Sequence, residues 1–316
     1  MNSIKITVAT PVYNREDCIG RCIESVINQR YNDIEHWIVD DGSTDHTFQI
    51  VERYAKQYPF IRCHTFDKNQ GVNAARNYAI QHSSKDFVIF LDSDDHLVEG
   101  ALTMINDKIL AYPGYCHYLF AQNDRMSYYN QNQALSGEIV ELTFADWLTE
   151  KISGDFAHVM VTPWVQMFPF DEHMRIYEGL NFMRIFKAGK KQLFIKEIVM
   201  NRERDRFDSV TKTTYLQNKD ASYKQYLFLK EMLSLFEADY LKFQQNDKLA
   251  VMVNRIFMLG LALDKYEENK SIKLQAKEKH IKLPLIFRIM DYLHLGFILR
   301  NTIYVYSYIK TSIVKK

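Results

Sequence analysis

Three carboxylates, those of Asp92, Asp94 and Asp95, lie within four residues of one another, directly after the wholly apolar run Phe87–Leu91. Carboxylates this close repel one another unless a cation neutralises them. Hard oxygen ligands suit Mg²⁺ or Mn²⁺, and such sites usually share the ion with the phosphates of a substrate. The alternative is a solvated acidic turn. The spacing alone favours the two interpretations equally.

Two further groups of polar residues follow β-branched segments in the same manner. Thr10–Arg15 overlaps the end of the segment Ile4–Thr10, and Asp40 and Asp41 follow Ile34–Val39. Any one of these groups alone would be explained as a turn or a helix cap. Their recurrence after three apolar segments predicts instead that they belong to one site.

The elements that would position these groups alternate along the first hundred residues. Apolar and β-branched runs predict strands at Ile4–Thr10, Ile34–Val39, Ile61–Phe66 and Phe87–Leu91. Apolar residues at helical spacing predict helices at Asp17–Asn28, Thr44–Gln57 and Val72–Gln81. This alternation predicts βαβ units and a parallel sheet. Right-handed crossovers would place the loops after the strands at one sheet edge, where open α/β sheets bind their ligands.

The chain has no glycine-rich loop after its first predicted strand, because its first glycine is Gly20. This excludes both the dinucleotide-binding GxGxxG turn and the Walker loop as the phosphate binder.

The composition is that of a globular chain. Its 316 residues carry 40 basic and 39 acidic side chains, and 47% of them are hydrophobic, which argues against a disordered chain. The near-zero net charge argues against a general nucleic-acid binder. No secretory leader and no uncharged apolar run of about 18 residues is evident. We therefore expect a cytoplasmic protein.

Four motifs occur in order over the first third of the chain, and together they resemble glycosyltransferase family 2. They are TPVYNRE (Thr10–Glu16), VDDGSTD (Val39–Asp45), NQGVNAARN (Asn69–Asn77) and FLDSDD (Phe90–Asp95). The match continues less tightly through Phe170–Glu178 and the predicted strand Leu193–Asn201. Members of this family have the GT-A fold, use nucleotide-sugar donors and invert the anomeric carbon.

The resemblance implies an α/β fold with a GT-A-type, mostly parallel sheet flanked by helices, and a mainly helical C-terminal extension. The GT-A domain is expected over residues 1–212, with a nucleotide-sugar-binding half at 1–105 and an acceptor half at 106–212. The helical extension is expected over residues 213–316.

The resemblance also implies roles for the residues at the predicted sheet edge. Pro11 and Tyr13 would line the pocket for the base, with Tyr13 stacking near it. Asp41 would accept a hydrogen bond from the base, which favours uracil because its N3 carries a proton. Asp40 would contact the ribose or hold the turn.

The remaining implied roles concern the phosphates and the metal. Gly71 would permit close backbone approach, and Arg76 would face the nucleotide or its pyrophosphate. Asp92 would contact the ribose or the metal, and Asp94 would be the principal ligand of Mg²⁺ or Mn²⁺. Arg202, Arg204 and Arg206 follow a predicted strand, in a region that closes over the donor diphosphate in many relatives. A solvated basic loop is the equal alternative for these arginines.

The general base is where the sequence departs from the family pattern. In the family an acidic pair precedes a helix in the second half, and its Asp usually serves as base. Here Glu178 matches, but Gly179 occupies the expected Asp position. Glu178 is therefore the candidate base, and Asp171 and Glu172 are the fallbacks. If Glu178 does not reach the acceptor, the alternatives are a slow enzyme, a substrate-assisted one, or a binding protein without catalytic activity.

The C-terminal residues differ in character from the rest. Residues 1–100 have a net charge of −5, whereas residues 270–316 have a net charge of +8. A stripe of apolar residues at steps of three or four runs from Leu285 to Tyr306. This stripe either packs on the catalytic domain or lies on anionic lipid. The second interpretation predicts a peripheral membrane contact through 270–316, at the inner face of the membrane.

The sequence thus predicts a metal-dependent inverting glycosyltransferase. Its expected donor is a nucleotide-sugar, with a UDP-sugar favoured, and its expected acceptor is a glycan or lipid-linked glycan in surface polysaccharide biosynthesis. A non-catalytic sugar-nucleotide-binding protein is the first alternative, and a nucleotidyltransferase is the second. No oligomeric state is predicted.

Overall fold

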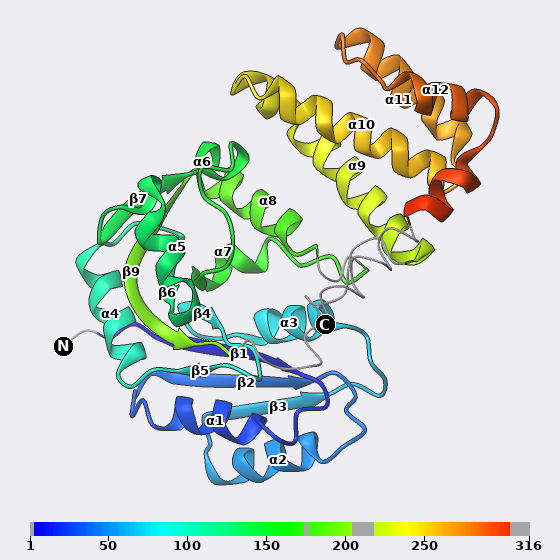
Figure 1. Ribbon diagram of the computed structural model, residues 1–316. Helices are drawn as coiled ribbons and strands as arrows, with labels where there is room; N and C mark the ends of the chain where they lie inside the picture. The colour runs from blue at the N-terminus through cyan, green and yellow to red at the C-terminus, as the bar shows by residue number, and fades with distance from the viewer. Residues whose placement is uncertain (1–2, 174–176, 204–217, 304–316) are drawn as a thin grey trace. The chain divides into compact units, whose positions relative to one another are not determined.

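A computed structural model describes residues 3–173, 177–203 and 218–303 (Figure 1). The chain divides into two compact units, Met1–Asp205 and Arg206–Lys316. The predicted domain boundary at 212–213 lies outside the described residues. No described helix is both long enough and apolar enough to cross a lipid bilayer.

The N-terminal unit is built on a mixed sheet whose strands run in the order β3-β2-β1-β4-β8-β6-β9-β5, with β7 pairing with β9. The first four strands in this order are parallel, as is the β6–β9 pair. The other pairings are antiparallel. The strands are β1 (Ile6–Val12), β2 (Ile34–Asp40), β3 (Ile61–Thr65), β4 (Phe87–Phe90), β5 (His96–Leu97), β6 (His117–Gln122), β7 (Ile139–Thr143), β8 (Ala157–Val161) and β9 (Lys191–Asn201).

Helices cover both faces of this sheet (Figure 1). They are α1 (Ile19–Ile27), α2 (Thr47–Gln57), α3 (Val72–His82), α4 (Ala101–Ala111), α5 (Met126–Gln131), α6 (Phe144–Leu148), α7 (Thr162–Gln166) and α8 (Gly179–Gly189). Apolar residues of α1 and α4 share one core cluster with Val8 and Ile89, whereas those of α3 and α8 share another with Ala9 and Val88. Neighbouring strand residues thus face opposite cores, as the strand period of two requires. The predicted α/β fold with helices on the sheet is confirmed.

Strand β1 is central, and all seven of its residues are buried. It continues through Pro11 to Val12, two residues beyond the predicted end at Thr10. A central strand is hydrogen-bonded to a neighbouring strand on each side. Proline has no backbone N–H, so it cannot donate the hydrogen bond that its position would make to one of them. It is accommodated here because the pairing with β4 has already ended at Ala9, so this part of β1 pairs only with β2.

The C-terminal unit is helical, as predicted. It contains α9 (Lys219–Lys242), α10 (Asn246–Ala262), α11 (Tyr266–Glu278) and α12 (Leu285–Tyr292), and residues 296–303 are also helical. A Cβ on Gly260 of α10 would lie 2.2 Å from Oδ1 of Asn269 on α11. Only glycine therefore permits these two helices to pack this closely.

Candidate active site

The loops after β1, β2 and β4 meet at one edge of the sheet, because these strands are parallel neighbours in the order β2-β1-β4. The Asp41 amide donates to the carbonyl of Val12 at 2.8 Å, and the Leu91 amide donates to the carbonyl of Ala9 at 3.0 Å. The three polar groups predicted to share a site are therefore brought together at this edge.

Asp40 is 1% exposed and holds the turn that follows β2. Its Oδ2 accepts hydrogen bonds from the Ser43 amide at 3.1 Å and from the Thr65 hydroxyl at 2.7 Å. Its Oδ1 accepts a further bond from the Ser43 hydroxyl. Of the two roles expected for Asp40, these contacts favour the structural one.

Asp41 joins two of the four motifs. The backbone amide of Gln70 donates to its Oδ1 at 2.7 Å, and that of Gly71 donates to its Oδ2 at 2.9 Å. The residue is 3% exposed. It thereby holds the loop before α3 against the end of β2. Gly71 has φ +102° at the N-cap of α3, a conformation that L side chains rarely adopt.

Gly42 directly follows Asp40 and Asp41, and its backbone packs against Lys68, in the loop that Asp41 holds. Its φ is +72°, and an added Cβ would lie 2.8 Å from the carbonyl carbon of Lys68. We expect Gly42→Ala to lower the free energy of unfolding by about 1–2 kcal/mol for the left-handed backbone, with about 1–3 kcal/mol more for the contact. Chemical denaturation measures this.

Gly100→Ala is the matched control for this prediction. Its φ is +73°, but nothing lies within 4 Å of the position that a Cβ would take. It should therefore show only the backbone cost. Equal losses in the two variants would contradict the argument that Gly42 is required by its close approach to Lys68.

Tyr13 and Pro11 differ in accessibility. Pro11 is buried within β1, whereas Tyr13 is 39% exposed at the site edge. The next residue, Asn14, has φ +49°, and its Oδ1 accepts from the Thr44 amide at 2.8 Å. This bond ties the loop after β1, which carries the exposed ring of Tyr13, to the loop after β2.

Arg76 of α3 lies between two acidic residues that come from distant parts of the chain. Its Nη2 is 2.9 Å from Oδ1 of Asp92, and its Nη1 is 3.6 Å from Oε1 of Glu178. Burial lowers the pKa of Arg76, but the attraction of Asp92 and Glu178 more than offsets this, so the pKa is raised. One guanidinium thus connects a predicted nucleotide residue with the candidate base.

Asp95 is the buried member of the acidic turn, at 5% exposed. Its Oδ1 accepts from the Glu203 amide at 3.2 Å, and its Oδ2 lies 3.7 Å from Nε of Arg202. Burial, and then the charges of Asp92 and Asp94, raise the pKa of Asp95 well above its usual range. The three carboxylates of this turn are therefore close enough to affect one another's charge.

Of the arginines after β9, Arg202 belongs to this site, whereas Arg204 and Arg206 lie outside the described residues. Besides Asp95, Arg202 reaches Oδ2 of Asp155 at 2.9 Å and Oε1 of Gln122 at 3.0 Å. Arg202 directly follows β9, so it links this strand from the second half of the chain to the acidic turn. The sequence predictions did not include Asp155 and Gln122, since both come from segments that meet Arg202 only in the folded chain.

The donor set of the acidic turn fits a divalent ion that shares its ligands with a substrate. Asp92 and Asp94 are half-buried residues of the turn after β4. Within the described ranges, no group of three or more His, Cys, Asp or Glu side chains is arranged to hold an ion. Mg²⁺ is commonly bound through one or two carboxylates together with substrate phosphates, and Asp92 and Asp94 are the two half-buried carboxylates of this turn.

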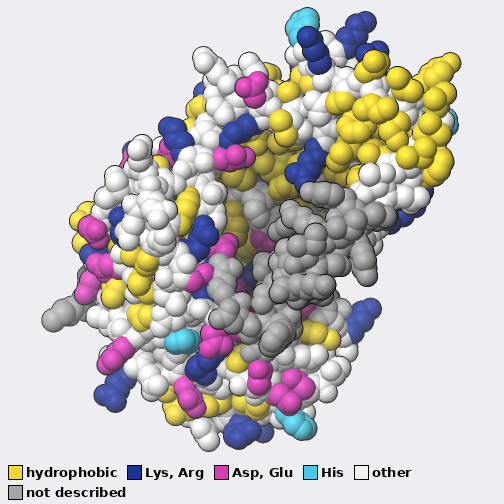
Figure 2. Space-filling model, in the orientation of Figure 1, with side chains coloured by type: hydrophobic (Ala, Val, Ile, Leu, Met, Phe, Trp, Pro, Cys, Tyr) yellow, Lys and Arg dark blue, Asp and Glu magenta, His cyan; other side chains and the backbone are white. Residues whose placement is uncertain are grey.

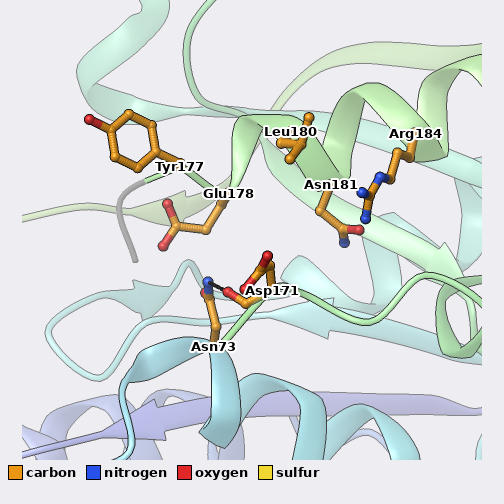
Figure 3. Close-up of a pocket in the computed structure, with 7 residues that line it drawn as sticks. All are labelled: Asn73, Asp171, Tyr177, Glu178, Leu180, Asn181 and Arg184. Carbon is orange, nitrogen blue, oxygen red and sulfur yellow. Dashed lines mark hydrogen bonds between the residues drawn. The ribbon is translucent and has the colours of Figure 1, made fainter. Parts of the chain in front are cut away.

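A small pocket opens beside Glu178 (Figure 3). Glu178 is the N-cap of α8, and Asp171 comes from the loop before it. A Cβ on Gly179 would contact nothing within 4 Å, so the position of the missing acid is open space. The residues that line the pocket are Asn73, Asp171, Tyr177, Glu178, Leu180, Asn181 and Arg184.

The two fallback bases make local contacts in this region. Oδ1 of Asp171 accepts from the His173 amide at 2.9 Å, which is a turn contact. Oε1 of Glu172 accepts from Nδ2 of Asn77 at 3.0 Å. Asp171 lines the same pocket as Glu178, whereas Glu172 does not.

Comparisons with known proteins agree with these observations. Residues 7–159 match the family model described as Glycosyl transferase family 2. The chain is 29% identical over 239 residues to the GalNAc(5)-diNAcBac-PP-undecaprenol beta-1,3-glucosyltransferase of Campylobacter jejuni, and this alignment covers 74% of each chain. It is 34% identical over 130 residues to the glycosyltransferase GlyA of Streptococcus pneumoniae, an alignment that covers 40% of this chain but only 18% of that protein.

Solved structures share the fold. TarS residues 1–349 of S. aureus in complex with UDP-GlcNAc align with a TM-score of 0.62 at 21% identity, over 95% of this chain and 89% of that one. The mannosyltransferase PcManGT of Pyrobaculum calidifontis, in complex with GDP-Man and Mn²⁺, aligns with a TM-score of 0.56 at 16% identity, over 96% and 88%. The GT-A architecture is thereby confirmed for this chain.

Proposed function

Because this chain is a glycosyltransferase of family 2, we propose that it transfers a sugar from a UDP-sugar to a glycan or lipid-linked glycan, with inversion at the anomeric carbon. The observation that carries the proposal is the Arg76 bridge, which joins Asp92 at the strand ends to Glu178 beside a pocket. A donor site and a proton acceptor are thus next to each other. A nucleotidyltransferase is not supported.

The nucleotide would occupy the edge formed by the loops after β1 and β2. Tyr13 supplies an exposed ring for stacking on the base. The carboxylate of Asp41 accepts the backbone amides of Gln70 and Gly71, which fixes its orientation at this edge, and a carboxylate is the type of acceptor that N3–H of uracil requires. The UDP-GlcNAc complex of TarS supports this choice of donor.

Mg²⁺ or Mn²⁺ would be held by Asp94 and Asp92, together with the donor diphosphate. When bound, such an ion stabilises the charge that grows on the departing diphosphate. Asp92 would then exchange part of its contact with Arg76 for the ion, since both use the same carboxylate. The Mn²⁺ in the PcManGT complex supports a divalent ion.

The transfer is a single displacement. An acceptor oxygen attacks the anomeric carbon from the face opposite the diphosphate, and the carbon–oxygen bond to the diphosphate breaks with its electron pair on the phosphate oxygen. The acceptor proton passes to Glu178, which Arg76 holds at 3.6 Å. The pairing with Arg76 orients the carboxylate before the acceptor arrives.

Nucleotide titration by calorimetry tests the donor assignment. In the presence of Mn²⁺, UDP should bind to the wild-type protein, whereas GDP, ADP and CDP should bind at least about tenfold more weakly, because a mismatched base leaves a buried polar group unpaired. Tighter binding of GDP than UDP would overturn the assignment of uracil.

A lipid-linked acceptor would be reached from a membrane surface. The C. jejuni relative is named for an undecaprenol-linked substrate, which supports an acceptor of this class.

Figure 2 shows hydrophobic side chains gathered over the C-terminal unit. On α12 and the residues after it, the exposed apolar side chains are Leu285, Ile286, Ile289, Tyr292, Leu293, Phe297 and Ile298. Exposed Arg288 lies on α12, and exposed Lys282 lies just before it. We propose that this surface lies on anionic lipid.

Flotation with lipid vesicles tests the membrane contact. The double variant Ile286→Asp with Ile289→Asp should lose flotation with vesicles of phosphatidylglycerol and phosphatidylcholine in equal parts, because acidic groups on this surface oppose both burial and charge attraction. Val251→Asp on α10, which also replaces an exposed apolar residue (66% exposed), is the matched control and should float like the wild type. Equal flotation of all three proteins would contradict the proposal.

A further inference from the structure

Two buried asparagines line the pocket beside Glu178, and both have an unsatisfied oxygen. Asn73 is 2% exposed and Asn181 is 4% exposed. Their Oδ1 atoms have no hydrogen-bond partner among the described residues. Figure 3 shows Glu178 and Asn181, on the first turn of α8, facing Asn73 and Asp171 across the gap.

The orientation of both amides is fixed by their other atom. Nδ2 of Asn73 donates to the carbonyl of Asp171 at 2.8 Å, and Nδ2 of Asn181 donates to the carbonyl of Phe168 at 2.9 Å. A carbonyl only accepts, so the nitrogen must face it in each case. The oxygen is therefore the buried atom that is left without a hydrogen-bond partner in each side chain.

Buried polar atoms are almost always hydrogen-bonded, and an unsatisfied one is costly. Two such atoms belong to residues that line one small pocket together with the candidate base, and we take this as evidence that a ligand completes their hydrogen bonds. The ligand must present two donors. A phosphate group does not meet this requirement, because at neutral pH it carries at most one proton that it could donate. The carboxylates of Asp171 and Glu178 would also repel its negative charge.

We infer that Asn73 and Asn181 form a subsite that accepts hydrogen bonds from two hydroxyl groups on one edge of a sugar ring. This inference rests on the proposed function and adds a specificity element to it. The sugar is either the one transferred or the one that receives it, because both must lie beside Glu178. Sites that hydrogen-bond a substrate hydroxyl strongly disfavour analogues that lack it.

Asn77 offers a matched control within the same helix as Asn73. Its Nδ2 donates to the carbonyl of Phe170 at 2.8 Å, and its Oδ1 accepts from the Phe170 amide at 2.8 Å. It thus anchors the same loop as Asn73 and Asn181, but its oxygen is satisfied and it does not line the pocket. Asn77→Leu therefore measures the effect of losing a loop anchor alone.

The test compares Asn73→Leu, Asn181→Leu and Asn77→Leu with the wild type in two arms. The donor arm measures by calorimetry, with Mn²⁺, how much more tightly UDP-glucose, UDP-galactose and UDP-GlcNAc bind than UDP. The acceptor arm measures, by saturation-transfer NMR with UDP present, the binding of methyl β-glucoside and methyl β-galactoside.

We expect Asn73→Leu and Asn181→Leu each to weaken sugar binding about tenfold in one arm, while UDP affinity stays at the wild-type value. The arm that responds identifies the sugar as donor or acceptor. Indistinguishable behaviour of all three variants in both arms would overturn the inference and leave the pocket as a site for water. Failure of the wild type to bind UDP would instead overturn the proposed function.

Discussion

Asp94→Asn is expected to reduce sugar transfer by about a hundredfold to a thousandfold while the fold stays intact. The substitution keeps the shape of the side chain and removes its charge. Asp94 is half-buried at the strand edge, and its charge acts on the neighbouring Asp95. A neutral amide is a weak ligand for Mg²⁺ or Mn²⁺, so the diphosphate would lose its counter-charge in the transition state.

The rate of nucleoside diphosphate release measures this effect, and the thermal unfolding midpoint checks the fold. Glu99→Gln is the control, since it removes an exposed carboxylate only a few residues away. It should leave the rate unchanged. An Asp94→Asn protein that releases UDP at the wild-type rate would show that the metal assignment is wrong.

Glu178→Gln is expected to lower the rate of transfer by about a hundredfold to ten-thousandfold and to leave UDP binding unchanged. Glutamine preserves the N-cap position of α8 but cannot accept the proton of an acceptor hydroxyl. Arg76 retains its shorter contact to Asp92, at 2.9 Å, in this variant. The nucleotide side of the site should therefore be preserved.

Asp171→Asn is the comparison for the base, because Asp171 lines the same pocket. It should lower the rate far less than Glu178→Gln. Steady-state kinetics with a saturating donor distinguish the two. If Asp171→Asn abolishes transfer and Glu178→Gln does not, Asp171 is the base and the assignment of Glu178 is wrong.

The sheet edge could be predicted from the sequence because its signals are local. Apolar runs of about four to seven residues, each followed by acidic or polar residues, identify the buried strands and the ends at which ligands bind. The motif resemblance predicted the fold as well. The structure confirms that the loops after β1, β2 and β4 lie together.

The remaining features depend on segments that meet only in three dimensions. Arg76 meets Glu178 across about a hundred residues of sequence, and Asp41 holds the amides of Gln70 and Gly71. No periodicity or spacing reports such contacts. The antiparallel strands β7 and β8 were also not predicted, since their partners β9 and β4 are distant in the chain.

The apolar stripe in the C-terminal unit shows that the spacing of apolar residues does not predict where a helix ends. Steps of three and four residues from Leu285 to Tyr306 predicted a continuous stripe, but α12 ends at Tyr292 and His294 has φ +55°. The backbone therefore turns before the next helical residues. Part of the positive charge is also neutralised internally, because Lys273 is paired with Asp291 at 2.5 Å and Lys279 with Glu237 at 2.7 Å.

The most direct test of the central claim is the release of nucleoside diphosphate by the wild-type protein from a panel of UDP-sugars. Released UDP is measured with Mn²⁺ and with EDTA, alongside calorimetric UDP binding in the same preparation. We predict release from at least one UDP-sugar, its loss in EDTA and its recovery when Mn²⁺ is restored. Measurable UDP binding without release from any UDP-sugar would contradict the account.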